Sequence, residues 1–262
     1  IHIGEEVRVS TNISEFDRIL GGGLVYNLSF IDLKKDTDEN SFKEQLISND
    51  EFYGISFKND SSRGFLNSVD SLDAIVILLI VCAGGLASML EEARHNAGAL
   101  AKHIHFQQMN AEKLAFQTAS FDVLVTRNVT WNLHDPEKAY AQWMRVLKPG
   151  GVLLNFDANW YRYLWDEGAQ LAHAQDRKNL QSADVRDETA GTDVSAMEAI
   201  ARQAPLSAHQ RPAWDLRVLR GLGMQAAADT EIWKQVWTKE ERINNASTPM
   251  FLVEGWKRSL LQ

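Results

Sequence analysis

The sequence predicts an α/β fold: a doubly wound, mostly parallel sheet with helices on both faces. Three observations carry this prediction. From about residue 87 onward, apolar runs of strand length alternate with stretches of helical periodicity, which implies right-handed crossovers. The run GVLLNFDAN (151–159) is apolar enough to be buried on both faces, as in a parallel sheet. The polar stretch 160–213 interrupts the alternation, and we interpret it as a helical insertion after the fifth strand.

The most hydrophobic part of the chain runs from Ala74 to Ala83. It has about half of the roughly 20 residues that a bilayer-spanning helix needs, so a buried strand is predicted. A helix should follow, because Ser88 and Glu91 have the spacing of a capping box, in which each side chain satisfies a backbone N–H group at the helix start.

The remaining elements follow from periodicity and turn residues. Further strands are predicted at 103–110, 121–128, 224–233 and 248–257, the last two as a hairpin pair. In the second of these, Phe121, Val123 and Val125 should share one face. A helix should begin at Asp135-Pro136 and end at Lys148-Pro149-Gly150-Gly151. Its buried stripe is expected to be Tyr140, Trp143, Met144 and Leu147.

The N-terminal part differs in character from the rest. Residues 26–72 are polar and weakly periodic, which is typical of loops or irregular surface segments. We therefore divide the chain into an irregular segment, 1–72, that contributes at most helices and the first strand, and an α/β domain, 73–262, with 160–213 as a lid. The abrupt change near Leu86 also leaves open a fusion, a frameshift or an uncertain sequence assignment.

Composition limits the classes of partner. The net charge of −8 argues against nucleic acid or an anionic membrane, because phosphate binding needs clustered cations. The single cysteine, Cys82, cannot form an internal disulfide, which fits a reducing compartment. The first residues show no basic leader followed by an apolar run. A cytoplasmic protein is expected, with its oligomeric state open.

Three phrases resemble the class I S-adenosylmethionine-dependent methyltransferases, particularly their small-molecule branch. SMLEEAR (88–94) resembles the helix after the family's second strand, and MNAEKLAF (109–116) its motif after the third. The most specific phrase is FDVLVTRNVTWNLHDPEKAYAQWMRVLKPGGVLLNFD (121–157), which resembles the fourth strand, the next helix and the fifth strand. The resemblance extends over 87–262. It implies a Rossmann-like sheet and methyl transfer from S-adenosylmethionine to a small molecule.

The resemblance also implies residues that bind the cofactor. Asn110 would lie beside the adenine amino group, with the backbone of Ala111 close by and Glu112 closing that side. Asn128 would lie near the methionine part and its methyl group. The alternative explanation of Asn110 and Asn128 is that they form turns at strand ends.

Four residues are candidates for binding the methyl acceptor: Trp131, His134, Trp160 and Tyr161. Trp131 is just as readily a core residue, and His134 a surface or capping residue. No catalytic side chain is assigned, because such a reaction is accelerated mainly by proximity and orientation. No metal site is expected, since His103-x-His105 is the only pattern of histidines with suitable spacing.

The family's first motif, Gly-x-Gly-x-Gly after a strand, is not intact in this sequence. Gly84 and Gly85 imitate it, but counting back five residues from Met89 places them where the second strand ends and a ribose-binding carboxylate is expected. The first motif would then fall around 58–66. A non-catalytic scaffold that has lost its cofactor loop is therefore the alternative to an enzyme.

A second resemblance concerns RVSTNISEFDRILGGGLV (8–25), which is similar to the segment preceding the ATP-binding loop of RecA-like DNA-repair ATPases. The phosphate-binding loop that should follow, Gly-x-x-x-x-Gly-Lys-Ser/Thr, is absent from the sequence. ATPase activity is not expected.

Overall fold

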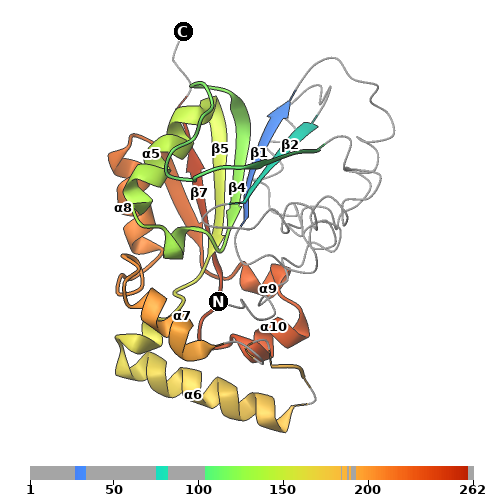
Figure 1. The fold of residues 1–262 in the computed structure, drawn as a ribbon, viewed down its shortest axis with the longest axis vertical. Coiled ribbons are helices and arrows are strands. Elements are labelled where there is room, and N and C mark those ends of the chain that lie inside the picture. The colour runs from blue at the N-terminus through green and yellow to red at the C-terminus, as the bar shows by residue number, and fades with distance from the viewer. Residues whose placement is uncertain are drawn as a thin grey trace.

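A seven-stranded sheet forms the centre of the computed structural model, which describes residues 27–33, 75–81 and 104–258 except 184, 188 and 190–192 (Figure 1). The strand order is β3-β2-β1-β4-β5-β7-β6. The strands are β1 (Asn27–Leu33), β2 (Ile75–Val81), β3 (Ile104–Gln108), β4 (Phe121–Arg127), β5 (Leu147–Asp157), β6 (Gln225–Asp229) and β7 (Phe251–Trp256).

Five of these strands run in one direction, while β1 and β7 run in the other. β2 pairs with β3, and β4 with β5, in parallel. β1 is antiparallel to both β2 and β4, and β7 to both β5 and β6. The predicted doubly wound α/β fold is confirmed, although the sheet is only partly parallel in its pairings. The hairpin-like pairing of the last two strands is also confirmed.

The first part of the sheet agrees with one prediction and adds a strand in the N-terminal part. β2 lies next to β3 and one strand away from β4, so its assignment as a second strand is confirmed. The place beside β4 is taken by β1, within the 1–72 segment that was expected to be mostly irregular but to contribute the first strand at most. β1 forms because its backbone can pair on both sides, in register with β2 and with β4. The 58–66 stretch itself, Gly84 and Gly85 lie outside the described residues.

Helix α5 (Pro136–Val146) begins as predicted. The Asp135 side chain caps it by accepting a hydrogen bond from the Lys138 amide at 3.0 Å, and Pro136 is its first residue. The helix ends before Lys148, because the chain enters β5 at Leu147 and pairs there with Phe121. Gly151 is required in this turn, since a Cβ atom there would lie 2.9 Å from the carbonyl oxygens of Asp122 and Lys148.

The two faces of the sheet are covered by separate hydrophobic clusters. Helices α5 and α8 (Ala213–Gly221) lie on one face (Figure 1), and the buried Tyr140, Trp143 and Leu219 belong to that cluster. On the other face, α9 (Trp233–Val236) contributes to a smaller cluster containing Phe156, Ile232, Val236, Trp237, Met250 and Leu252. Neighbouring β7 residues Phe251 and Leu252 point to opposite clusters, as strand alternation requires.

One predicted face of β4 is wrong. Phe121 belongs to the α5–α8 cluster together with Leu124, whereas Val125 packs against the α9 cluster. The cause is an irregularity in the pairing with β5 between Phe121 and Val123. Such a bulge shifts the alternation by one residue, so residues on either side of it exchange faces.

The insertion 160–213 is helical, as predicted. It contains η3 (Arg162–Leu164), α6 (Glu167–Ser182) and α7 (Val194–Ala201). Together with α10 (Lys239–Asn244), α6 and α7 lie beyond the carboxyl ends of β4 and β5 (Figure 1). We call 160–213 the lid segment. Within the described part of the chain, no helix combines the length and the apolar character needed to cross a membrane.

Candidate functional site

Asn128 is the first residue after β4 and carries the most informative side chain of the site. Its amide N–H donates to the Phe156 carbonyl at 2.9 Å, which extends the β4–β5 ladder by one bond. Its φ of 54° turns the chain sharply away from the sheet. The side chain is buried, 2% exposed, yet neither Nδ2 nor Oδ1 has a hydrogen-bond partner. A buried amide without partners costs free energy, so this group is suited to a ligand that supplies them.

The loop after β3 holds Asn110 in a local turn. Its Oδ1 accepts a hydrogen bond from the Glu112 amide at 2.8 Å, and the residue is exposed. The next residue, Ala111, is buried, and its carbonyl accepts a hydrogen bond from Trp143 Nε1 at 3.1 Å. The Asn110 side-chain oxygen thus stabilises a local turn, as the alternative interpretation predicts. The Ala111 backbone is held in place by its hydrogen bond to the buried Trp143.

Glu112 connects this loop to the one before α5. Its Oε1 accepts hydrogen bonds from the backbone amides of His134 at 2.8 Å and Asp135 at 3.0 Å. The carboxylate thus ties the loop after β3 to the loop before α5. The His134 side chain is exposed.

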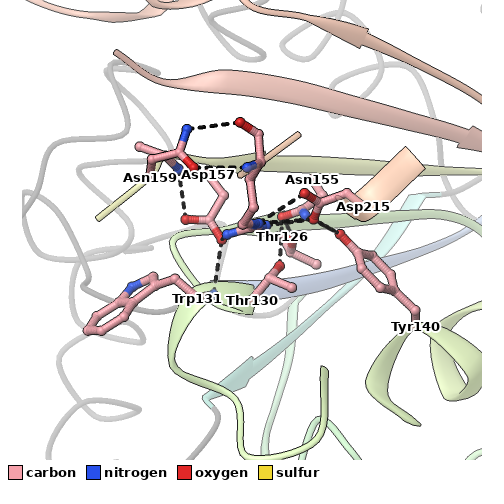
Figure 2. A network of polar contacts seen from close by, with 10 residues as sticks. Thr126, Thr130, Trp131, Tyr140, Asn155, Asp157, Asn159 and Asp215 are labelled. Atoms are coloured by element: carbon pink, nitrogen blue, oxygen red, sulfur yellow. Dashed lines mark hydrogen bonds and ion pairs between the residues drawn. The ribbon is translucent and has the colours of Figure 1, made fainter. Parts of the chain in front are cut away.

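A buried polar network lies behind the β4–α5 loop (Figure 2). Asn155 on β5 is its centre: its Oδ1 accepts from Thr126 Oγ1 at 2.5 Å and from Thr130 Oγ1 at 3.1 Å. Its Nδ2 donates to the Tyr140 hydroxyl at 2.8 Å, and that hydroxyl donates to Asp215 Oδ1 at 2.5 Å. Because both Oδ1 and Nδ2 of Asn155 have hydrogen-bond partners within the network, these contacts fix the geometry of the loop.

Arg211 continues the network to the end of β5. Its Nη1 donates to Asp157 Oδ2 at 2.8 Å, and its Nη2 donates to Asp215 Oδ1 at 2.7 Å. Asp157 Oδ2 also accepts the backbone amide of Trp131 at 3.1 Å. Asn159 binds the backbone of Arg211 with both ends of its side chain, at 2.9 and 3.0 Å. These ionic side chains are at most 1% exposed.

Burial and charge act in opposite directions on the pKa values of Arg211 and Asp157, and in the same direction on that of Tyr140. Burial works to lower the pKa of Arg211, but the charges of Asp157 and Asp215 raise that pKa well above its ordinary value. Burial raises the pKa of Asp157, and Arg211 offsets part of this rise. The pKa of Tyr140 is raised well above normal by burial and then by Asp215. The guanidinium is therefore a permanent charge at the centre of the network.

An aromatic wall extends from this network towards the lid segment. The rings of Trp131 and Tyr161 lie 5.1 Å apart, and those of Tyr161 and Tyr163 lie 5.9 Å apart. Burial, and then Glu198, raises the pKa of Tyr161 to about 12, so its hydroxyl stays protonated at neutral pH. Beside them in the chain, Trp160 has an indole Nε1 that is buried without a hydrogen-bond partner. The wall thus contains flat apolar surface and one unused donor.

Comparison with known proteins shows what this part of the chain is similar to. A family model described as a methyltransferase domain matches residues 71–155, from before β2 into β5. The resemblance predicted from the sequence is thereby confirmed.

Two curated relatives each match part of the chain. One is the ubiquinone/menaquinone biosynthesis C-methyltransferase UbiE of Pseudoalteromonas translucida, 44% identical over 71 residues, which are 26% of this chain and 28% of the relative. Another is the demethylmenaquinone methyltransferase of Leptospira interrogans, 34% identical over 95 residues, 33% of this chain and 38% of the relative. The chain thus spans less than two fifths of the length of these relatives.

Two solved structures that the chain matches are both at low sequence identity. The YcgJ protein from Bacillus subtilis has a TM-score of 0.41 at 18% identity, covering 69% of this chain and 82% of that one. Geranyl diphosphate methyltransferase in complex with SAM has a TM-score of 0.41 at 13% identity, covering 68% and 67%.

The structure brings together only some of the predicted site residues. Glu112 joins the Asn110 loop to the loop of His134, and the Trp131 and Tyr161 rings meet. Trp131 is also a core residue, 5% exposed. Gly84 and Gly85 lie outside the described residues.

Sequence reasoning missed the ionic part of the site. Asp157 was visible as an acidic residue ending an apolar strand, but its partner Arg211 lies 54 positions later. The available signal was the pair Arg211 and Asp215. They are four residues apart, so at the start of a helix their opposite charges lie next to each other.

The lid segment should be sensitive to pH through His173. Its ring stacks on Tyr163 at 4.0 Å, and its pKa is lowered, first by burial and then by Arg177. A histidine whose pKa is lower in the folded state contributes its stability above the unfolded-state pKa of about 6.5. This stability is lost as the pH falls below that value and through the folded-state pKa. We expect the melting temperature to drop further between pH 8 and pH 5.5 in the wild type than in His173→Phe, which keeps the stack. Equal drops would contradict this expectation.

Proposed function

We propose that the chain is an S-adenosylmethionine-dependent methyltransferase that acts on a small-molecule acceptor. The observation that carries the proposal is the Asn128 amide, buried and without partners where β4 ends, inside the segment that matches the methyltransferase model. Ligands of open α/β sheets bind beyond the carboxyl ends of the strands, which is where this amide lies. A carboxylate, amine or hydroxyl of a bound cofactor would satisfy it.

The residues of two loops would hold the cofactor. Asn128 would hydrogen-bond its amino-acid part, and the fixed backbone of Ala111 would face its adenine, with the Asn110 amide group at the rim. When bound, S-adenosylmethionine supplies an electrophilic methyl group. Glu112 keeps the two loops at a constant separation through its bonds to His134 and Asp135. Rate enhancement then comes from holding the two reactants in line, which requires no dedicated base.

The acceptor would bind against the aromatic wall of Trp131 and Tyr161. Flat aromatic side chains favour a flat, largely apolar acceptor, and the free indole N–H of Trp160 favours one that carries an oxygen. A quinol meets both conditions. The relatives are named for menaquinone and ubiquinone biosynthesis, which makes a short-chain demethylmenaquinol analogue the first acceptor to test.

Calorimetric titration with S-adenosylhomocysteine tests the proposal. We expect Asn128→Ala to weaken binding about tenfold or more, since each lost hydrogen bond is worth about 1 kcal/mol and 1.4 kcal/mol is a factor of ten. Asn110→Leu should also weaken binding if its side chain faces the adenine. Asn179→Ala, an exposed amide on α6, is the matched control and should bind like the wild type.

Two results would decide against parts of this proposal. A wild-type chain that binds no ligand at millimolar concentration would support the non-catalytic scaffold, which the absence of an intact Gly-x-Gly-x-Gly motif favours. Unchanged affinity in Asn110→Leu would refute the adenine assignment alone.

A further inference from the structure

The two ends of the lid segment meet beside the aromatic wall. Asn159 directly precedes the segment, and Arg211 lies at its far end. The side chain of Asn159 donates to the Arg211 carbonyl at 2.9 Å and accepts from the Arg211 amide at 3.0 Å. This pair of bonds closes the segment into a loop whose ends are held at a fixed separation.

One carboxylate oxygen links this closure to the acceptor wall. Asp157 Oδ2 accepts Arg211 Nη1 at 2.8 Å and the Trp131 backbone amide at 3.1 Å. The position of Trp131 therefore depends on the same atom that anchors the end of the lid segment. Its ring in turn rests on Tyr161, in the first residues of the lid segment.

Arg211 cannot rotate within this arrangement. Its Nε and Nη2 donate to Asp215, at 2.9 Å to Oδ2 and 2.7 Å to Oδ1, while Nη1 is held by Asp157. A guanidinium can make such a planar, two-sided set of bonds, and an ammonium group cannot. The α8 carboxylate thus orients Arg211, and Arg211 orients Asp157.

We propose that Arg211 is a positioning residue for the acceptor site: through Asp157 it fixes the backbone of Trp131, and so the place of the Trp131 indole against Tyr161. The acceptor wall is then set before any acceptor arrives, and the lid segment and the β4–α5 loop keep one relative position. The role in acceptor binding rests on the proposed function, whereas the mechanical link is a property of the contacts alone.

Fluorine NMR of the full chain labelled with 5-fluorotryptophan tests the link. The chain has eight tryptophans, and Trp131→Phe identifies the resonance of Trp131. We expect Arg211→Lys to shift or broaden this resonance while the Trp143 resonance keeps its position. The matched control is Arg177→Lys, which changes a lid arginine that binds Asp187 and the Asn244 carbonyl. It should leave Trp131 unchanged.

A second variant covers the case in which Arg211→Lys does not fold. Asn159→Ala removes only the two bonds to the Arg211 backbone and leaves both buried charges paired, so we expect a smaller change of the same Trp131 resonance. A folded Arg211→Lys chain, or in its absence a folded Asn159→Ala chain, with an unaltered Trp131 signal would overturn the proposal.

Titration of the same samples with S-adenosylhomocysteine separates this inference from the proposed function. We expect Arg211→Lys to bind it within about twofold of the wild type, because the cofactor residues Asn128 and Ala111 make no bond to Arg211. If the wild type does not bind and the Trp131 signal still responds to Arg211→Lys, the proposed function fails and the positioning role of Arg211 remains. If Arg211→Lys changes the affinity for S-adenosylhomocysteine by more than about twofold while the Trp131 resonance stays unaltered, Arg211 belongs to the cofactor site and the inference is overturned.

Discussion

Replacing Arg211 with alanine is expected to destabilise the folded chain by about 3 to 5 kcal/mol, the usual cost of removing one partner from a buried ion pair. Two carboxylates, Asp157 and Asp215, would remain in a site where no charged side chain is more than 1% exposed. Urea unfolding followed by circular dichroism measures the loss. The control is Arg162→Ala, whose partner Asp166 and own side chain are 41% and 34% exposed. It should cost at most about 1 kcal/mol.

The pH dependence of the Arg211→Ala variant provides an independent check. Burial already raises the pKa of Asp157, and Arg211 opposes that rise. Without Arg211 the folded-state pKa lies further above the unfolded value. Such a group favours the folded state at low pH and loses that contribution as the pH rises. The deficit relative to the wild type should therefore be smaller at pH 5 than at pH 7.5, and a constant deficit would contradict this account.

Local signals in the sequence predicted the elements whose formation depends on neighbouring residues. Asp135 and Pro136 mark the start of α5 because capping and the fixed φ of proline act within one turn. The end of α5 was predicted too late. The chain leaves the helix at Leu147 because β5 pairs there with Phe121 on β4, and no local residue signals that pairing.

The position of β1 could not be predicted for the same reason. The segment Asn27–Leu33 has an ordinary mixed composition, and its place between β2 and β4 is fixed by partners about 50 and 100 residues away in sequence. Periodicity detects a buried face, whereas it contains no information about which strand lies alongside. The direction of β1 is likewise a property of the sheet and not of its residues.

In the candidate site too, features set by local sequence could be predicted, and those set by contacts between distant residues could not. Asn110, Glu112 and Asn128 were found because polar residues at strand ends are visible in the sequence, and the structure places Asn128 in a buried position without partners. That Glu112 ties two loops together, and that Arg211 bridges β5 and α8, depends on contacts across 22 and 54 positions. Long polar bridges of this kind require the fold itself.

Trp143→Ala is expected to be the most costly apolar substitution, at about 3 to 5 kcal/mol, because it removes a large, fully buried ring from the cluster between the sheet and α5. Its indole packs edge-on against Tyr140 at 5.2 Å, and its Nε1 supplies the hydrogen bond of the Ala111 carbonyl. Alanine therefore leaves a cavity and an unpaired buried oxygen together.

Two variants separate these contributions of Trp143. Trp143→Phe fills most of the volume but cannot donate to Ala111, so it should lie between the wild type and Trp143→Ala in urea unfolding. Trp165→Ala, at a half-exposed position on the lid segment, should change stability by no more than about 0.5 kcal/mol. Because Ala111 is a predicted cofactor residue, Trp143→Phe should also weaken S-adenosylhomocysteine binding, while Trp165→Ala should not. Equal ligand affinity in both variants would mean that Trp143 stabilises the core without shaping the loop after β3.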